Sequence, residues 1–165
     1  IYAELLGGAV NCGGHRNVGS MTAPNPESVQ RCIRAAVADA GITVADVDAV
    51  NGHLTATFAD PHEVKNWAVA LERTPATFPW INSTKSLVGH CLGGAGAVES
   101  VGVVLQLCKG FLHPSVNSED AHPEIAAFAP RIPQVAVEDP GVKIFAKAGF
   151  GFGDVNSCMI FKKWA

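Results

Sequence analysis

The sequence is poor in charged residues. Aspartate, glutamate, lysine and arginine make up 16% of its 165 residues, against about 25% in a typical soluble domain. The net charge of −3 gives no reason to expect nucleic acid or an anionic membrane as a partner. Because hydrophobic residues reach 48%, we expect part of the surface to be covered by further polypeptide or by another subunit.

Metal-binding and disulfide patterns are absent from the sequence. The five cysteines are odd in number and form no CxxC pair. This pattern does not exclude oxidation of a cysteine or catalysis by one, but it favours a reducing cytoplasm. The six histidines show no HExxH spacing, so no metal site is expected. No run of 18 apolar residues suggests a membrane span. The chain starts without methionine in a strand-like segment, and we expect it to belong to a longer polypeptide.

Apolar runs that end at turn residues alternate with segments of helical periodicity. Strands are predicted at residues 2–10, 47–50, 78–82, 142–148 and 155–162. Helices are predicted at residues 26–41, 61–71 and 91–109, with a loop at 113–133. This order predicts a single α/β domain over residues 1–165, in which helices are layered on a mixed sheet.

Polar segments follow three of these strands, at residues 51–57, 83–90 and 149–156. In α/β proteins the ends of the strands are where functional sites lie. Each segment alone is weak evidence, since a histidine after a strand is more often a structural hydrogen-bonding group than a catalyst. The glycines at 93–96 lack phosphate-binding spacing and favour close helix packing.

One carboxylate interrupts the most apolar predicted helix. A buried Glu99 without a partner would cost about 3–5 kcal/mol, and Lys85 is the only cation just upstream. We therefore expect Lys85 to form an ion pair with Glu99 or with Glu63. The pattern leaves a second possibility open, namely that Glu99 lies with Gln106 on the solvent-facing stripe of the helix.

Together, the three segments resemble motifs of the β-ketoacyl-[acyl-carrier-protein] synthases I and II, condensing enzymes of the thiolase superfamily. That family carries N-A-H-G-T-S-T, T-K-S-x-x-G-H-S-x-G-A-A-G and F-G-F-G-G-x-N. Here the segments read NGHLTAT (51–57), TKSLVGHCLGGAG (84–96) and FGFGDVN (150–156). The resemblance extends over the whole chain and implies a thiolase-like C-terminal half.

The resemblance also implies roles for single residues. His53 and His90 resemble the two active-site histidines, and Lys85 resembles the lysine that precedes the second one. Glu63 and Glu99 fall where the family keeps the carboxylates that hold this lysine.

Four further residues match substrate-binding positions of the family. Thr55 and Thr57 resemble threonines that contact the pantetheine arm, and Phe152, with Phe150 beside it, resembles the gate of the acyl pocket. The sequence departs from the motifs at Leu54, Ala56, Cys91, Asp154 and Val155. These departures leave the histidine pair intact, but the resemblance does not imply the family's chain-length or partner preference.

The implied reaction is a decarboxylative Claisen condensation of an acyl thioester with malonyl-acyl-carrier protein, in fatty acid or polyketide synthesis. Two neutral imidazoles would donate N–H groups to the thioester oxygen. We expect His90 to lie at the start of a helix, whose positive end would help to keep the imidazole neutral. No cofactor is expected beyond the phosphopantetheine of acyl carrier protein. The expected partners are acyl carrier protein, the N-terminal half of the synthase and, in the full-length protein, a second copy.

The family's nucleophilic cysteine belongs to the N-terminal half, which is not in this sequence. Cys91 adjoins the site but does not occupy a strand-to-helix elbow, so it is not expected to be the nucleophile. The chain alone is accordingly expected to be inactive. Two alternatives stay open, a non-catalytic subunit similar to a chain-length factor and a homologue that only decarboxylates. The retention of His53, Lys85 and His90 argues against the first.

Overall fold

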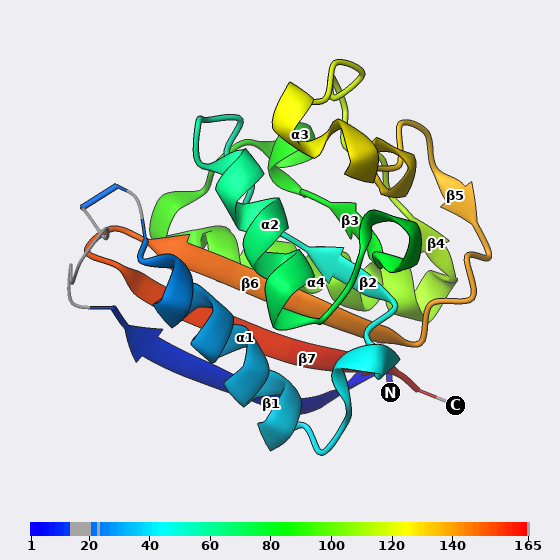
Figure 1. Ribbon diagram of the computed structural model, residues 1–165. Helices are drawn as coiled ribbons and strands as arrows, with labels where there is room; N and C mark the ends of the chain where they lie inside the picture. Colours follow the sequence, from blue (N-terminus) through cyan, green and yellow to red (C-terminus); the bar gives the residue numbers. More distant parts are fainter. Residues whose placement is uncertain (14–20, 23, 165) are drawn as a thin grey trace.

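The computed structural model describes residues 1–13, 21–22 and 24–164. A five-stranded sheet in the order β1-β7-β6-β2-β3 forms its centre (Figure 1). The strands are β1 (Ala3–Cys12), β2 (Ala49–Asn51), β3 (Trp80–Asn82), β6 (Ile144–Gly151) and β7 (Val155–Lys163). A separate two-stranded sheet joins β4 (Phe111–Leu112) and β5 (Val137–Glu138).

Helices cover both faces of the large sheet. Helices α1 and α2 lie in front of it in the view of Figure 1, and α4 lies behind it. The α-helices are α1 (Pro26–Asp39), α2 (Asp60–Ala70), α3 (Lys85–Val88) and α4 (Ala95–Lys109). Shorter 3-10 segments are Val44–Asp46, Pro75–Thr77, Leu92–Gly94 and Pro123–Arg131. The layered α/β fold with a mixed sheet is therefore confirmed.

Three local predictions differ from the structure. The helix expected from residue 91 begins as a regular helix at Ala95, because the three residues before it, Leu92–Gly94, form a 3-10 turn in which Leu92 has a φ of +48°. The expected loop at 113–133 contains the 3-10 helix that buries Ile125 and Phe128. Strand β6 continues through the predicted turn to Gly151, since Gly149 and Gly151 pair with β7.

The large sheet is mixed because it contains both parallel and antiparallel pairs of strands. Strand β2 pairs in parallel with both β3 and β6, whereas β7 pairs antiparallel with β6 and β1. The last residue of β2, Asn51, stands between Asn82 and Lys147. The carboxyl ends of β2, β3 and β6 therefore meet at one edge of the sheet, where side chains from three segments converge.

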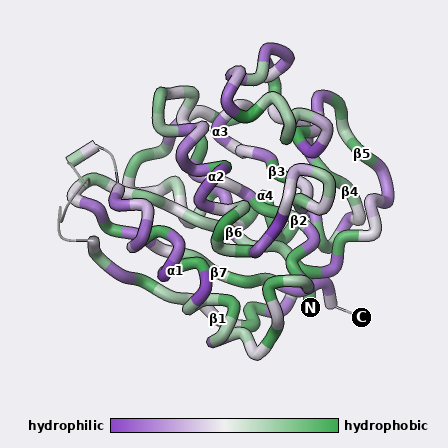
Figure 2. The backbone as a smooth tube through the Cα atoms, viewed as in Figure 1, coloured by the Kyte–Doolittle hydropathy of each residue, from purple (hydrophilic) through white to green (hydrophobic). Residues whose placement is uncertain are grey.

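Two hydrophobic cores hold the layers together. Ile33, Trp67 and Ile160 are buried between the sheet and helices α1 and α2, whereas Leu107 and Phe145 belong to the core beneath α4. Hydrophobic residues colour much of β7, which contributes to both cores (Figure 2). No helix among the described residues is long and apolar enough to cross a membrane.

Helix α4 has one buried side and one apolar side that is exposed. Its sheet-facing side buries Glu99, Val103, Gln106 and Leu107. Its outer side leaves Val98, Val101 and Leu105 exposed, at a spacing of three and four residues that places them on one stripe.

Candidate functional site

Two imidazoles face each other at the carboxyl end of the sheet. His53 follows β2 and His90 follows α3, and their ring centroids lie 5.3 Å apart with the planes at 83°. Phe150 of β6 approaches His53 at 6.2 Å between centroids. The strand ends thus bring together segments that are far apart in the sequence.

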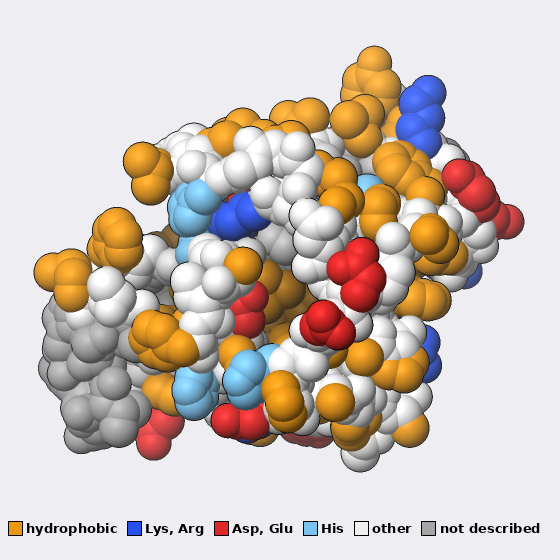
Figure 3. All heavy atoms as spheres, turned by 90° about the horizontal axis from the view of Figure 1, so that it is seen from above, with side chains coloured by type: hydrophobic (Ala, Val, Ile, Leu, Met, Phe, Trp, Pro, Cys, Tyr) orange, Lys and Arg blue, Asp and Glu red, His pale blue; other side chains and the backbone are white. Residues whose placement is uncertain are grey.

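The expected substrate-binding residues share a cavity with these histidines. The cavity has a volume of about 790 Å³ and its lining includes His53, Thr55, Thr57, His90, Phe150 and Phe152. The prediction that the two imidazoles face one pocket with these side chains on its wall is confirmed. Figure 3 looks onto this end of the molecule, where histidine side chains gather around a hollow.

A second cavity of about 560 Å³ adjoins the first. The two share Thr55, Thr57, Asp60 and His90 in their linings, and Lys85 lines only the second. The imidazole of His90 is therefore accessible from two sides, one that contains Phe150 and Phe152 and one that contains the lysine.

The segment with His53 is fixed by two carboxylates of the first turn of α2. Asp60 accepts N–H groups from Thr55 and Ala56, each at 3.0 Å, while Ala56 adopts a φ of +57°. The hydroxyl oxygens of Thr55 and Thr57 lie 3.1 Å apart. Asp60 thereby holds the two threonines at the wall of the cavity.

Glu63 has a different role from the one expected. Its carboxylate accepts the backbone N–H groups of His53 at 2.7 Å and Leu54 at 2.9 Å, and the indole N–H of Trp67 at 3.3 Å. No ion pair joins Glu63 to Lys85 within the described residues, so Glu63 is not the one of the two predicted carboxylates that pairs with this lysine. Burial raises the pKa of Glu63 to about 7, against the effect of the hydrogen bonds.

Lys85 forms the expected ion pair with Glu99. Both side chains are buried, and Glu99 is only 2% exposed, so the alternative of a solvent-facing glutamate is wrong. Gln106, which would have shared that stripe, is also buried and accepts a hydrogen bond from Asn82 at 2.8 Å. The polar side of α4 therefore faces the sheet.

A second lysine, Lys147 of β6, also binds Glu99. Its ammonium group lies 2.5 Å from Oε2 of Glu99, and its side chain is 1% exposed. Lys147 is not among the site residues predicted from the sequence. Lys147 is a charged residue inside an apolar run, between Phe145 and Ala148, just as Glu99 is a charged residue inside an apolar helix.

A hydrogen bond sets the tautomer of His90. The backbone N–H of Leu92 donates to Nδ1 of His90 at 3.0 Å, so a neutral ring carries its proton on Nε2. The expectation that His90 opens a helix is wrong, because α4 begins five residues later, at Ala95. Since the helix dipole acts mainly within the first turn, the local hydrogen bond explains the tautomer better.

His53 is held neutral by its surroundings. Its pKa is lowered to about 4, first by burial and then by the positive charges of Lys85 and Lys147. At neutral pH the ring therefore carries a proton on one of its two nitrogens, and this N–H group can serve as a hydrogen-bond donor.

Buried amides connect the strand ends to α4. Asn51 donates to Oδ1 of Asn82 at 3.1 Å and to the hydroxyl of Thr84 at 3.0 Å. The same hydroxyl lies 3.1 Å from Nε2 of His113. This network, which spacing in the sequence did not indicate, fixes the polar turn before Lys85.

Comparisons with known proteins identify the family. Residues 2–119 match the family described as "Beta-ketoacyl synthase, C-terminal domain". The chain is 37% identical over 164 residues to 3-oxoacyl-[acyl-carrier-protein] synthase I, chloroplastic, of Arabidopsis thaliana, covering 98% of this chain and 33% of that protein. It is 34% identical to 3-oxoacyl-[acyl-carrier-protein] synthase 1 of Haemophilus influenzae, with 99% and 38% covered.

Solved structures agree with these relatives. A ketosynthase in complex with a type II PKS acyl-carrier protein superimposes with a TM-score of 0.86 at 30% identity, over 100% of this chain and 39% of that one. The ishigamide ketosynthase/chain length factor gives 0.87 at 29% identity, with the same coverage. The chain thus spans a little over a third of the length of most of these relatives. It belongs to the β-ketoacyl synthase family, in which it matches the C-terminal domain.

Proposed function

We propose that this chain supplies the two-imidazole site for decarboxylative condensation of an acyl thioester with malonyl-acyl-carrier protein. The observation that carries the proposal is the pair of rings, His53 and His90, 5.3 Å apart on the wall of one cavity. One ring is kept neutral by burial and nearby cations, and the other has Nδ1 occupied as an acceptor.

The chemistry requires such donors. When the malonyl carboxylate leaves as carbon dioxide, the electron pair of the broken C–C bond forms an enolate, and negative charge develops on the thioester oxygen. An N–H group aimed at that oxygen typically contributes about 3–4 kcal/mol to the transition state. The carbanion carbon then attacks the acyl carbonyl and displaces the thiolate that held the acyl group.

The remaining site residues suit a substrate on a phosphopantetheine arm. The hydroxyls of Thr55 and Thr57 can contact the amides of the arm, while Phe150 and Phe152 provide an apolar wall for an acyl chain. Lys85 acts as a positioning residue next to His90. One solved relative is described as an acyl-carrier protein in complex with its ketosynthase, which supports the same partner here.

The acyl group needs a thiolate, and we propose that none of the cysteines of this domain provides it. Burial raises the pKa of the thiols of Cys32 and Cys158 above the usual range, which makes both poor nucleophiles. We propose that the N-terminal half of the synthase contributes the nucleophile, and that the complete protein is a homodimer. All five cysteines are free, in keeping with a reducing compartment such as the cytoplasm.

The test measures carbon dioxide release from malonyl-acyl-carrier protein by the protein that carries this domain. His53→Ala and His90→Ala should each lower the rate about 100- to 1,000-fold, whereas Arg31→Ala, at an exposed residue of α1 that lines neither cavity, should not. Wild-type rates in both histidine variants would contradict the proposal. Decarboxylation without formation of a β-ketoacyl product would favour the homologue that only decarboxylates.

A further inference from the structure

Lys147 occupies a position that packing alone does not explain. It lies on β6 two residues after Phe145, which is buried in the core beneath α4, and side chains two apart on a strand share a face. Its ammonium group contacts Oε2 of Glu99 and donates a hydrogen bond to the carbonyl of Ala148. A buried ammonium costs several kcal/mol to desolvate, whereas a methionine would fill similar space without that cost.

The Glu99 carboxylate is shared between two ammonium groups. Lys85 binds Oε1 and Lys147 binds Oε2, and all three side chains are nearly inaccessible. Burial raises the pKa of Glu99, but hydrogen bonds from Lys147 and Lys85 outweigh it and leave this pKa below its usual value. Two ammonium groups and one carboxylate leave one positive charge in the cluster.

Other titratable groups surround this cluster. Glu63 of α2 and Cys158 of β7 are close enough to interact electrostatically with Lys147, and His53 interacts with both lysines and with Glu99. Burial is the largest influence on Lys147 itself and lowers its pKa, while Glu99 opposes the shift. The uncompensated positive charge therefore lies close enough to act on the imidazole of His53.

We propose that Lys147 is a positioning residue of the two-histidine site, which fixes the Glu99 carboxylate and keeps the buried cluster positive behind the imidazoles. The proposal rests on the proposed function and deepens it. A carboxylate held at both oxygens cannot rotate away from Lys85, so the lysine next to His90 stays in place. The positive charge disfavours imidazolium and stabilises the enolate that forms on decarboxylation.

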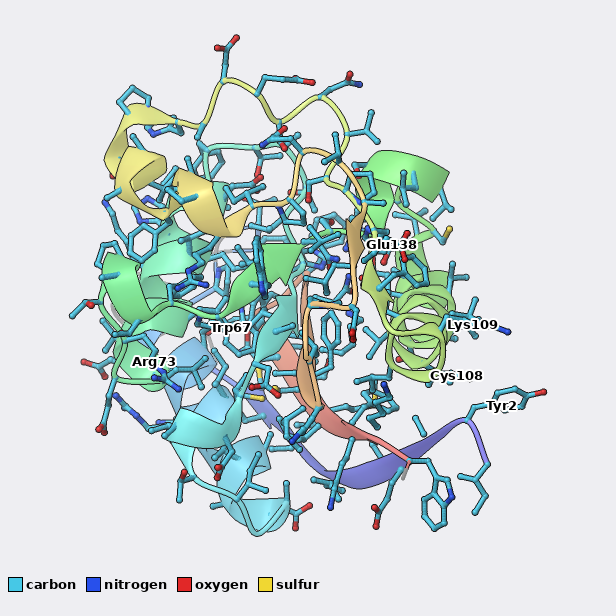
Figure 4. The ribbon with its side chains drawn as sticks, turned by 90° about the vertical axis from the view of Figure 1, so that its right-hand side faces the viewer. Tyr2, Trp67, Arg73, Cys108, Lys109 and Glu138 are labelled. Atoms are coloured by element: carbon cyan, nitrogen blue, oxygen red, sulfur yellow. The ribbon has the colours of Figure 1, made fainter. Side chains whose placement is uncertain are left out.

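The experiment compares three variants of the protein that carries this domain. Lys147→Met removes the charge, and Lys147→Arg keeps it. Lys109→Met removes a charge from the exposed end of α4, where the side chain points away from the sheet (Figure 4). Lys109 is ten residues from Glu99, about 15 Å along the helix. Two quantities are measured, the pKa of His53 by NMR of labelled histidine and the acid limb of the pH profile of malonyl-acyl-carrier protein decarboxylation.

Loss of the Lys147 charge makes imidazolium less costly, so the pKa of His53 should rise. We expect an increase of about one unit in Lys147→Met, with the acid limb moving to higher pH by the same amount. Lys147→Arg and Lys109→Met should leave both quantities at their wild-type positions. A role confined to folding would lower the melting temperature without moving either one.

An unchanged pKa in folded Lys147→Met, or an equal shift in Lys109→Met, would overturn the inference. If Lys147→Met does not fold, the wild-type titration decides, because a His53 pKa at or above 6.5 would show that the cluster does not act on the ring. Absence of carbon dioxide release from the wild type would overturn the proposed function alone, since the titration requires no turnover.

Discussion

Glu63 is an unusual carboxylate because its burial and its hydrogen bonds act in opposite directions. Three N–H groups favour the charged form, yet burial dominates and raises its pKa to about 7. An ordinary glutamate in the unfolded chain titrates near 4.5. Between these two values the folded protein binds the proton more tightly than the unfolded chain does.

The stability of the protein should therefore depend on Glu63 between pH 4.5 and about 7. Its contribution is fully present below the unfolded pKa and is lost as the pH rises through the folded pKa, a loss of about 3 kcal/mol. Glu63→Gln removes this pH-dependent contribution to the free energy of unfolding. The measurement is the free energy of unfolding against pH in urea, where the difference between wild type and variant should fall as the pH rises.

The comparison of wild type with Glu63→Gln isolates the contribution of the Glu63 side chain. His53, whose pKa is lowered to about 4, destabilises the fold as the pH falls and is common to both proteins, so it cancels. A difference that stays constant from pH 4.5 to 8 would show that the hydrogen bonds keep Glu63 charged throughout.

Single residues also show what sequence could reveal about the site. His53, His90 and the Lys85–Glu99 pair were predictable, because polar side chains after strands and a carboxylate in an apolar helix stand out against their surroundings. The choice between Glu63 and Glu99 as partner of Lys85 was not. It depends on which face of α2 and α4 meets the strand ends, and this follows from tertiary packing.

At the scale of elements, two of the glycines in and beside α4 differ in conformation. Gly110 caps the helix in the left-handed region, at a φ of +72°, whereas Gly96 lies in the first turn with no atom near the position of a Cβ. Gly110→Ala should destabilise the protein by about 1–2 kcal/mol because of backbone strain. Gly96→Ala should stabilise it by up to about 1 kcal/mol through reduced chain entropy.

Thermal or urea unfolding of both variants gives the comparison. Each substitution adds one methyl group to the same helix, so a difference in burial does not explain opposite signs. Equal effects in the two variants would show that the cap conformation of Gly110 carries no cost for alanine.

Element boundaries were harder to predict than element types. The strand at 142–148 was identified from its apolar residues, but its extension to Gly151 depends on pairing with Val155 and Asn156 across the hairpin. Glycine signals a turn locally, and only the partner strand shows that it remains in the ladder. The 3-10 helix Pro123–Arg131 was missed for a similar reason, since its Ile125 and Phe128 are buried by contacts with distant segments.

At the scale of the molecule, the outer stripe of α4 is the clearest apolar surface that is left exposed. Val98, Val101 and Leu105 lie exposed on one side of a helix whose other side is fully buried. The low charge content led to the expectation of a covered apolar face, and the proposed occupant is the N-terminal half of the synthase.

The isolated chain should self-associate through this stripe. Val101→Lys should weaken the association about tenfold or more, since placing a charge in an apolar contact costs at least about 1.4 kcal/mol. Val69→Lys, at a similarly exposed valine of α2, is the matched control and should have no effect. Sedimentation equilibrium over a range of concentrations provides the measurement, and a strictly monomeric wild-type chain would contradict the prediction.

The pairing of β1 with β7 has a consequence for how the polypeptide folds as it is made. Ala3 pairs with Lys163, and among the described residues β7 is the only strand that pairs with β1 in the sheet. At synthesis rates of about 5–20 residues per second, β1 leaves the ribosome roughly ten to thirty seconds before its partner strand exists. Strand β1 must therefore be shielded from other nascent chains for as long as translation takes to reach β7, however fast the completed sheet can close.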